Sequence, residues 1–445
     1  MNKIFFVICL ILFGSAFSAH ARLFNISEYT LSNGIKLLVV PNHKAPIVKH
    51  MVWYNVGAVD EKPGKGGSAH LLEHLMFRGT KNIPGSEFNR ILQQNGADSN
   101  AFTSQDFTAY HQNLDISRLE LAMYMEADRM QNLEFSPIDF ETERNIVYQE
   151  RKQVVENQPL SAFSENMQHI LWQDHPYANP VSGTETEILN LTSEDVMDIY
   201  RRYYAPGNAV VVLAGDIEPE TAYRLAEKYY GKVPPRDTGS RIVFPDMNPT
   251  LKSRLNMELP RVELPRIIRR YMADSYNTDP GRIYALAVLS RYLGEGDTSA
   301  LYKELVIRRE LALDVSSSYN YASRSYGSFN IAAVPQNGVS VEKLQQALDE
   351  AVANAVDEID DKKIAKIKNK MLAGLIYLKD NPFDAAYIVG SLYSIGMSRE
   401  DIENYADNIR KVSAGDVRKA AQQLLKNYAV AEGVVKPQSR EKAHD

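Results

Sequence analysis

Cysteine is nearly absent from this 445-residue sequence, because its single cysteine, Cys9, lies within the first 21 residues. Small exported domains often depend on disulfides because they cannot build a sufficient hydrophobic core. A chain of this length can bury more than one core without such cross-links. We therefore expect a mature protein that has neither a thiol nor a disulfide.

Long basic runs and long apolar runs are also missing. Lys and Arg number 50 against 56 Asp and Glu, which gives a formal net charge of −6. This mild acidity gives no support to nucleic-acid binding. Beyond residue 21 no apolar stretch reaches the roughly 20 residues that a membrane helix needs. The sequence thus predicts no nucleic-acid partner and no membrane span after the leader is removed.

The first 21 residues have the pattern of a secretory signal peptide. Lys3 precedes an apolar run over residues 4–13, and the sequence Ala-His-Ala follows at 19–21. Because the run is too short to span a bilayer, we expect cleavage after Ala21, with an uncleaved signal anchor as the alternative. Cleavage removes one lysine and no acid, so the net charge falls from −6 to −7. The expected location is the periplasm of a Gram-negative bacterium.

Strand-like and helix-like segments are interleaved along the mature chain. Apolar or alternating runs occur at GIKLLVV (34–40), KHMVWYNVGAV (49–59) and AVVVLAGDI (209–217), and a helical period occurs at 116–130. Mixed elements of this kind indicate an α+β or α/β sandwich rather than an all-β fold. Residues 233–253 concentrate proline, charge and small polar residues.

We interpret residues 233–253 as a linker between a first domain (22–232) and a second domain (254–445). The two halves look related, because an Asp-Val pair opens a helix at 195–196 and again at 416–417, and an apolar strand follows each helix. A tandem duplication explains the 221-residue spacing better than coincidence does.

The clearest chemical signal is the sequence HLLEH, which places His70, Glu73 and His74 within five residues. On a helix these three fall on one side, and an apolar stripe falls on the other. Imidazoles at i and i+4 are one turn apart and can converge on one metal ion. Ser68 is the expected N-cap of this helix, and Gly79 is the expected stop.

A catalytic zinc site usually has three protein ligands and a water, so a third ligand must come from elsewhere if Glu73 is to act as a base. A second helix is expected to start at Ser136 and Pro137. It carries Glu143 and Glu150 seven residues apart on one face. That face also holds the stripe predicted to be buried, Phe140, Ile146, Val147 and Val154. A buried carboxylate needs a cation or hydrogen bonds, which zinc and a ligand histidine would supply.

These residues resemble a known family. H-x-x-E-H followed 76 positions later by glutamate, with another glutamate seven before it, is similar to the inverted-motif zinc metallopeptidases of the pitrilysin/insulinase family. Length and layout look most like its short bacterial branch, akin to mitochondrial processing peptidase subunits. The shared segments are HLLEHLMFRGT, SNAFTSQDFTAYH, ERNIVYQE, HPYANPVSGTETEI and YYAPGNAVVVLAGD.

The resemblance implies a role for each residue and one zinc ion per chain. His70, His74 and Glu150 would be the zinc ligands, Glu73 the general base and Glu143 a supporting carboxylate. The fold implied is two homologous α/β-sandwich halves, each a mostly antiparallel sheet covered by helices.

A peptide substrate would add to an edge strand at Asn100, Ala101 and Phe102 by backbone pairing. Zinc would lower the pKa of a water molecule and polarise the scissile carbonyl, and Glu73 would transfer the proton to the leaving nitrogen.

The sequence departs from the family where an arginine and a tyrosine are expected seven apart, in a stretch of the type L-R-E-K-x-G-L-A-Y. Val306 and Leu313 occupy those positions, and neither can stabilise an oxyanion. Arg308 and Arg309 are out of register by two or more residues, which turns them to another face. The resemblance therefore implies a homologous partner subunit that supplies the Arg/Tyr pair, with a homodimer as the alternative.

Two other readings stay open. The chain could hold zinc and bind peptides in a chaperone-like manner without cutting them, since the missing pair weakens chemistry more than binding. The motif residues could also be unrelated surface groups. His111 and His175 are expected to be hydrogen-bonded structural residues. The glycine-rich segment 294–300 lacks the lysine of a phosphate loop, so nucleotide binding is not expected.

Overall fold

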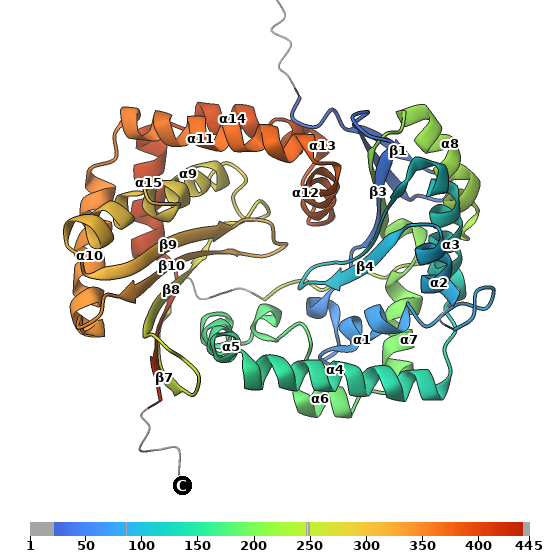
Figure 1. Cartoon of the computed structure of the whole chain (residues 1–445), viewed down its shortest axis with the longest axis horizontal. Coiled ribbons are helices and arrows are strands. Elements are labelled where there is room, and N and C mark those ends of the chain that lie inside the picture. Colours follow the sequence, from blue (N-terminus) through green and yellow to red (C-terminus); the bar gives the residue numbers. More distant parts are fainter. Residues whose placement is uncertain (1–21, 86, 246, 248–249, 439–445) are drawn as a thin grey trace, which may run out of the picture.

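The computed structural model describes residues 22–85, 87–245, 247 and 250–438. Two β-sheets, each covered by helices, lie side by side and face each other across the centre of the molecule (Figure 1). The predicted α+β class with two mostly antiparallel sheets is confirmed. The predicted leader and its cleavage site lie outside the described residues. No helix of the described part of the chain has the length and apolar character needed to cross a membrane.

The first sheet has six strands in the order β1-β2-β6-β3-β5-β4. Its strands are β1 (Ser27–Thr30), β2 (Lys36–Pro41), β3 (Ile47–Tyr54), β4 (Asp98–Thr103), β5 (Thr108–Asp115) and β6 (Ala209–Gly215). The helices of this half are α1 (Ser68–Leu75), α2 (Glu87–Gln94), α3 (Leu119–Asn132), α4 (Pro137–Asn157), α5 (Pro159–Trp172), α6 (Glu185–Leu189), α7 (Ser193–Tyr203) and α8 (Pro219–Tyr229). Strand β4 is an edge strand, so one side of its backbone is free for pairing.

The second sheet has five strands in the order β7-β11-β8-β10-β9. Its strands are β7 (Lys252–Leu259), β8 (Arg266–Ala273), β9 (Ala312–Asn320), β10 (Gly327–Pro335) and β11 (Val430–Pro437). The helices are α9 (Ile283–Gly294), the π-helix Tyr302–Arg308, α10 (Val341–Asp357), α11 (Asp361–Asp380), α12 (Pro382–Ser394), α13 (Arg399–Glu403), α14 (Tyr405–Lys411) and α15 (Ala414–Asn427).

The two sheets have the same topology. In each, the first of five strands pairs in parallel with the last, and the remaining pairs are antiparallel, so β2-β6-β3-β5-β4 matches β7-β11-β8-β10-β9. The helix before the last strand is capped alike in both, because Thr192 and Asp195 form a capping box on α7 and Ser413 and Asp416 form one on α15. The shared strand order and caps support the predicted duplication.

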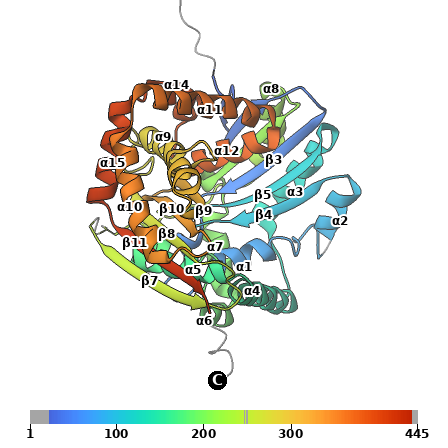
Figure 2. The same ribbon diagram turned by 60° about the vertical axis from the view of Figure 1, so that its left-hand side comes forward.

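One helix of each half packs on the sheet of the other half. Helix α5 packs on β7, β8 and β11 of the second sheet, and α12 packs on β2, β3 and β6 of the first (Figure 2). Glycines allow the close approach, because a Cβ on Gly390 of α12 would lie 2.2 Å from the indole of Trp53. The halves are therefore interlocked as well as linked.

The predicted linker is bonded to both halves, because the main-chain oxygen of Ile242 accepts a hydrogen bond from Arg324 of the second half and Arg241 contacts the first. Arg241 forms an ion pair with the buried carboxylate of Asp60 and donates to the main-chain oxygen of Asp106. Strand β7 begins at Lys252, so two residues of the predicted linker belong to a strand. The domain limits 22–232 and 254–445 stay a prediction.

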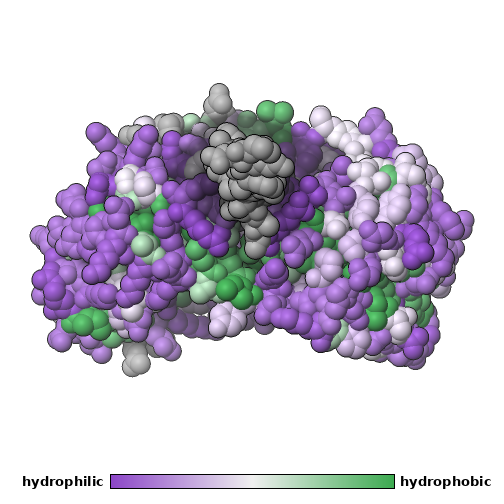
Figure 3. All heavy atoms as spheres, turned by 90° about the horizontal axis from the view of Figure 1, so that it is seen from above, coloured by the Kyte–Doolittle hydropathy of each residue, from purple (hydrophilic) through white to green (hydrophobic). Residues whose placement is uncertain are grey.

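Hydrophobic side chains form separate cores under the two sheets. Seen from above, hydrophilic residues cover most of the surface and hydrophobic ones gather in smaller patches (Figure 3). The core of the first half matters most for function, because it contains the apolar side of α1.

Replacing Gly390 with alanine should destabilise the protein by about 1–3 kcal/mol, because the new methyl group overlaps Trp53. Denaturant titration of the free energy of unfolding measures this. Gly374 in α11 is the matched control, since a Cβ there meets nothing within 4 Å. Gly374→Ala should stabilise by about 0.5–1 kcal/mol. Equal effects of the two substitutions would contradict the interlocked packing.

Candidate metal centre

Helix α1 presents three polar side chains on one face because its other face is fixed in the core. Leu71, Leu72, Leu75 and Met76 are fully buried in the first hydrophobic core. His70, Glu73 and His74 are left on the opposite side, as the sequence predicts.

The predicted ends of α1 were wrong in detail. The N-cap is Gly67, with φ +86, rather than Ser68, and the helix ends at Leu75, four residues before Gly79. A Cβ at Gly67 would lie 2.4 Å from the main-chain oxygen of Ser182. A residue outside the helix caps its N-terminus: the side chain of Glu61 accepts hydrogen bonds from the N–H groups of Gly67 (3.0 Å) and Ala69 (2.7 Å). Burial raises the pKa of Glu61 to about 8, although the two backbone N–H groups act in the opposite direction.

Helix α4 begins as predicted, with Ser136 as N-cap, Pro137 in the first turn and a capping box to Asp139. The prediction that its whole stripe is buried was wrong. Phe140, Glu143 and Val147 are buried, whereas the side chain of Glu150 is 48% exposed. An eight-residue helix is about 12 Å long and a 21-residue helix about 32 Å, so α1 covers only part of α4. Glu150 still lies against α1, since its Oε2 is 3.5 Å from His74 Nε2, but about half of its side chain is exposed.

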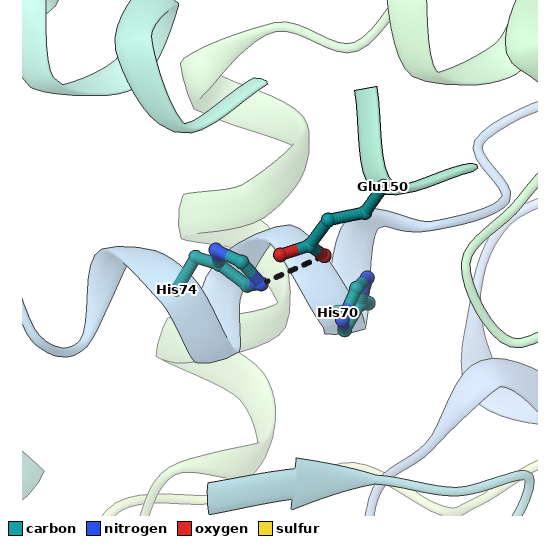
Figure 4. A group of neighbouring side chains, drawn as sticks. All are labelled: His70, His74 and Glu150. Atoms are coloured by element: carbon teal, nitrogen blue, oxygen red, sulfur yellow. Dashed lines mark ion pairs between the residues drawn. The ribbon is translucent and has the colours of Figure 1, made fainter. Parts of the chain in front are cut away.

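His70, His74 and Glu150 converge nevertheless (Figure 4). One nitrogen of each imidazole and one carboxylate oxygen all lie within 4.8 Å of one another. His74 Nε2 is 3.5 Å from Glu150 Oε2. Ligands at 2.0–2.2 Å from a tetrahedral zinc ion are separated by about 3.4 Å, so this spacing fits the ion.

The second nitrogen of His74 is held by Glu143. His74 Nδ1 lies 2.9 Å from Glu143 Oε2, and the other oxygen of Glu143 accepts a hydrogen bond from Arg78. Burial by itself would raise the pKa of Glu143, but the bonds from His74 and Arg78 hold it below its usual value. Burial would likewise lower the pKa of His74, but Glu143 and Glu150 raise it. A carboxylate on the far nitrogen fixes the tautomer and orientation of a ligand histidine.

His70 supports the same assignment. Its Nδ1 is buried and has no hydrogen-bond partner among the described residues. Burial, with a smaller effect from His74, lowers the pKa of His70 to about 4, so the imidazole is neutral at physiological pH. Neutral imidazole is the form that binds a metal ion. His70 is thus neutral, and one of its ring nitrogens lies within 4.8 Å of the candidate ligand atoms of His74 and Glu150.

Glu73 lies next to His70 and His74 on α1, and a residue of strand β4 holds its carboxylate. Its Oε2 accepts a 2.6 Å hydrogen bond from the hydroxyl of Thr103, which ends β4. Burial raises the pKa of Glu73 and outweighs that hydrogen bond, which acts in the opposite direction. Glu73 and His70 both line a cavity of about 490 Å³. Glu73 is thus a carboxylate outside the candidate ligand set, and it faces the same cavity as His70.

The predicted peptide-binding residues lie along the same cavity. Ala101 and Phe102 line it together with Thr103, and Asn100 precedes them on β4. Strand β5 pairs with one side of β4 and leaves the other side open.

Val306 and Leu313 lie away from this centre. Val306 packs against the core of the second half, and Leu313 is the second residue of β9. Arg309, between them in sequence, pairs with Glu350 of α10 at 2.8 Å. In Figure 1 this end of β9 lies by α10, on the far side from α1.

The sequence did not reveal three supporting residues: Glu61, Arg78 and Thr103. Arg78 lies three residues beyond the end of α1, and its four-residue spacing from His74 was the one available signal. His111 and His175 are hydrogen-bonded, as expected: His111 Nδ1 lies 2.8 Å from Lys49 Nζ, and His175 Nε2 lies 2.9 Å from Ser325 Oγ.

Two histidines on one helix and a glutamate on another, with a second glutamate nearby, could hold one metal ion in the manner of a hydrolytic site. Family models agree with this class. The model for insulinase (peptidase family M16) matches residues 36–185, and the model for the peptidase M16 inactive domain matches residues 190–371. The chain belongs to the pitrilysin/insulinase family of peptidases.

Individual relatives are similar over nearly the whole chain. The zinc protease PqqE of Helicobacter pylori is 28% identical over 440 residues, covering 97% of each chain. An uncharacterised zinc protease of Mycobacterium leprae is 29% identical over 436 residues, covering 94% of each. The crystal structure of a protease from Helicobacter pylori superposes with a TM-score of 0.84 at 26% identity, covering 93% of this chain and 99% of that one.

Replacing Glu143 with glutamine should lower zinc affinity by about 10–100-fold, because the neutral amide no longer offers a charge to His74 Nδ1. Competition with a chromophoric chelator measures the affinity. Glu141 is the control: it lies two residues away on α4 with its side chain 61% exposed, and Glu141→Gln should bind zinc as the wild type does. Unchanged affinity in Glu143→Gln would remove Glu143 from its supporting role.

Proposed function

We propose that this protein is a zinc metalloendopeptidase subunit that hydrolyses peptide bonds in extended peptides or unfolded segments. The observation that carries the proposal is the convergence of His70, His74 and Glu150, with a separate carboxylate, Glu73, that lines the same cavity as His70. The relatives named zinc proteases support it.

Each residue has a chemical role in this proposal. His70, His74 and Glu150 hold one zinc ion, which when bound polarises the scissile carbonyl and makes water a better nucleophile. Glu73 takes the proton from the attacking water and delivers it to the leaving nitrogen. Thr103 keeps the Glu73 carboxylate directed into the cavity, and Glu143 orients His74.

The substrate is an extended chain because the open side of β4 offers unpaired backbone groups. A peptide that adds there forms main-chain hydrogen bonds beside Asn100, Ala101 and Phe102, largely independent of its side chains. Thr103 at the end of β4 touches Glu73, so a peptide laid along this strand passes the catalytic carboxylate.

A partner subunit is needed to stabilise the tetrahedral oxyanion. Leu313 and Asn320 are seven residues apart on β9, a span of about 23 Å. Asn320 lies at the junction with the first half, where it lines a cavity with Gln105, and Leu313 is at the opposite end. Position 313 is thus remote from Glu73 in its own chain. We infer that a homologous chain supplies an Arg/Tyr pair across an intermolecular interface, in a heterodimer.

The proposed location is outside the cytoplasm, in the periplasm. The leader-like residues 1–21 motivate this, and a structural neighbour at 17% identity is a periplasmic protease, PqqL of Escherichia coli.

A second candidate function is peptide holding without turnover. Val306 and Leu313 favour it, because the chain keeps the binding strand and the metal site but not the oxyanion donors. Retention of peptides without cleavage, even with an Arg/Tyr-bearing homologue present, would support this alternative.

Glu73→Gln should retain one zinc ion per chain and lose hydrolysis by at least about 100-fold, because the amide cannot accept the proton. Metal analysis and cleavage of a quenched fluorescent peptide, with the partner present, measure the two effects. Glu141→Gln again serves as the control and should cleave normally. Retained cleavage in Glu73→Gln would remove Glu73 from the role of base.

The isolated chain should cleave peptides slowly. Adding a homologue that carries the Arg/Tyr pair should raise kcat/KM by about 100-fold or more, since a missing oxyanion donor typically costs that factor. The control is the same homologue with its arginine changed to alanine, which should raise kcat/KM only slightly. High chelator-sensitive turnover by the isolated chain would contradict the two-subunit proposal.

A further inference from the structure

A second cavity adjoins the metal cavity. It has a volume of about 450 Å³, and Gln105 and Gln168 line both spaces. The first cavity ends at β4, and the second begins at the loop 104–107 that follows this strand. A peptide laid along β4 past Thr103 is therefore led toward the second cavity.

Both halves of the molecule build this second cavity. The first half contributes the loop 104–107, and the second half contributes residues from the tip of the β9–β10 hairpin and from α12. The aromatic residues among its lining are Phe107, Trp172, Tyr177, Tyr326 and Tyr387. Tyr387 also contacts Phe102 of β4, with ring centroids 5.5 Å apart, so the aromatic lining continues to the proposed peptide-binding strand.

Two of the residues that line this cavity each have one acceptor atom without a donor. Gln105 Oε1 and Asp106 Oδ1 are buried and have no hydrogen-bond partner among the described residues. Asp106 is only 4% exposed, and its other oxygen accepts the hydroxyl of Tyr177 at 2.6 Å and the N–H of Arg324 at 3.2 Å. A buried acceptor without a donor is unfavourable, so a ligand that brings a donor gains affinity.

The charges around Asp106 argue against a cationic ligand. Arg241 donates to the main-chain oxygen of Asp106, and the main chain of Arg324 donates to its carboxylate. The guanidinium of Arg324 also lies 3.6 Å from the carboxylate of Asp60, so two arginines face two aspartates here. The cavity is thus close to neutral, aromatic in its walls and equipped with acceptors.

We propose that this cavity is a specificity subsite for an aromatic substrate side chain that carries a hydrogen-bond donor, a tyrosine or a tryptophan. Such side chains bury a large apolar area and need a partner for their single polar group. The aromatic walls meet the first need, and Gln105 or Asp106 meets the second. This inference rests on the proposed peptide-binding function of β4.

Binding to the zinc-loaded Glu73→Gln chain tests the subsite without hydrolysis. The probes are fluorescein-labelled alanine-rich peptides in which one position at a time is tyrosine, phenylalanine or alanine, read by fluorescence anisotropy. At one position tyrosine should bind roughly fivefold more tightly than phenylalanine, the factor expected for one hydrogen bond. Alanine at that position should bind more weakly than either.

Filling the cavity should remove this preference. Ser328 of β10 lines the cavity from the second half, and Ser328→Trp should abolish the preference for tyrosine at that position, whereas Ser328→Ala should keep it. Ala322→Trp fills the same space from the hairpin tip and gives a second variant if the first does not fold. Thermal melting and zinc content establish that each variant is intact.

The outcomes separate the subsite from the peptidase proposal. A preference that survives both filling variants, equal binding of tyrosine and phenylalanine at every position, or no positional preference would overturn the subsite. If wild-type protein with its partner still hydrolyses peptides in that case, the peptidase proposal stands. If the preference is present but nothing is hydrolysed, the subsite stands and the peptidase proposal fails.

Discussion

The whole site depends on the way one short helix is anchored. Helix α1 has eight residues, and its leucines are fully buried beneath the first sheet. This burial fixes the rotation of the helix about its axis. His70, Glu73 and His74 therefore lie on the side away from the hydrophobic core. Each fully buried leucine contributes about 1.5–3 kcal/mol, which is more than enough to hold two imidazoles in register before any metal binds. The other parts of the site, Glu150, Glu143 and Thr103, are positioned relative to this face.

The same scaffold explains why the second half has no such chemistry. Its sheet has the same strand order, and α9 lies between the second and third of its five strands, as α1 does among the five matching strands of the first half. Helix α9 is buried at nearly every position, so it leaves no polar face for a metal ion. The second half acts instead by position: its α12 covers the first sheet, and its β9–β10 hairpin reaches the loop after β4. One copy carries the candidate metal centre, and the other contributes to the walls of the space next to it.

Much of this could be predicted from the sequence. Periodicity alone placed the metal-binding side of α1 opposite its leucines, and the Ser136-Pro137 start of α4 put Glu143 and Glu150 on one face. The exposure of Glu150 could not be predicted, because helical periodicity gives the face of a residue and not how closely neighbouring elements cover it. The cap from Glu61 and the contact between Arg324 and Asp106 join residues that only the folded chain brings together. The packing of α5 and α12 on the sheet of the opposite half could not be predicted for the same reason, since it depends on how the two sheets meet in the folded chain.

Anomalous diffraction at the zinc absorption edge, from crystals of the zinc-loaded chain, tests the central claim most directly. The account predicts one strong peak at about 2.0–2.2 Å from a nitrogen of His70, a nitrogen of His74 and an oxygen of Glu150, with Glu73 uncoordinated. A peak at other residues, coordination by Glu73, or no peak at this position would contradict it.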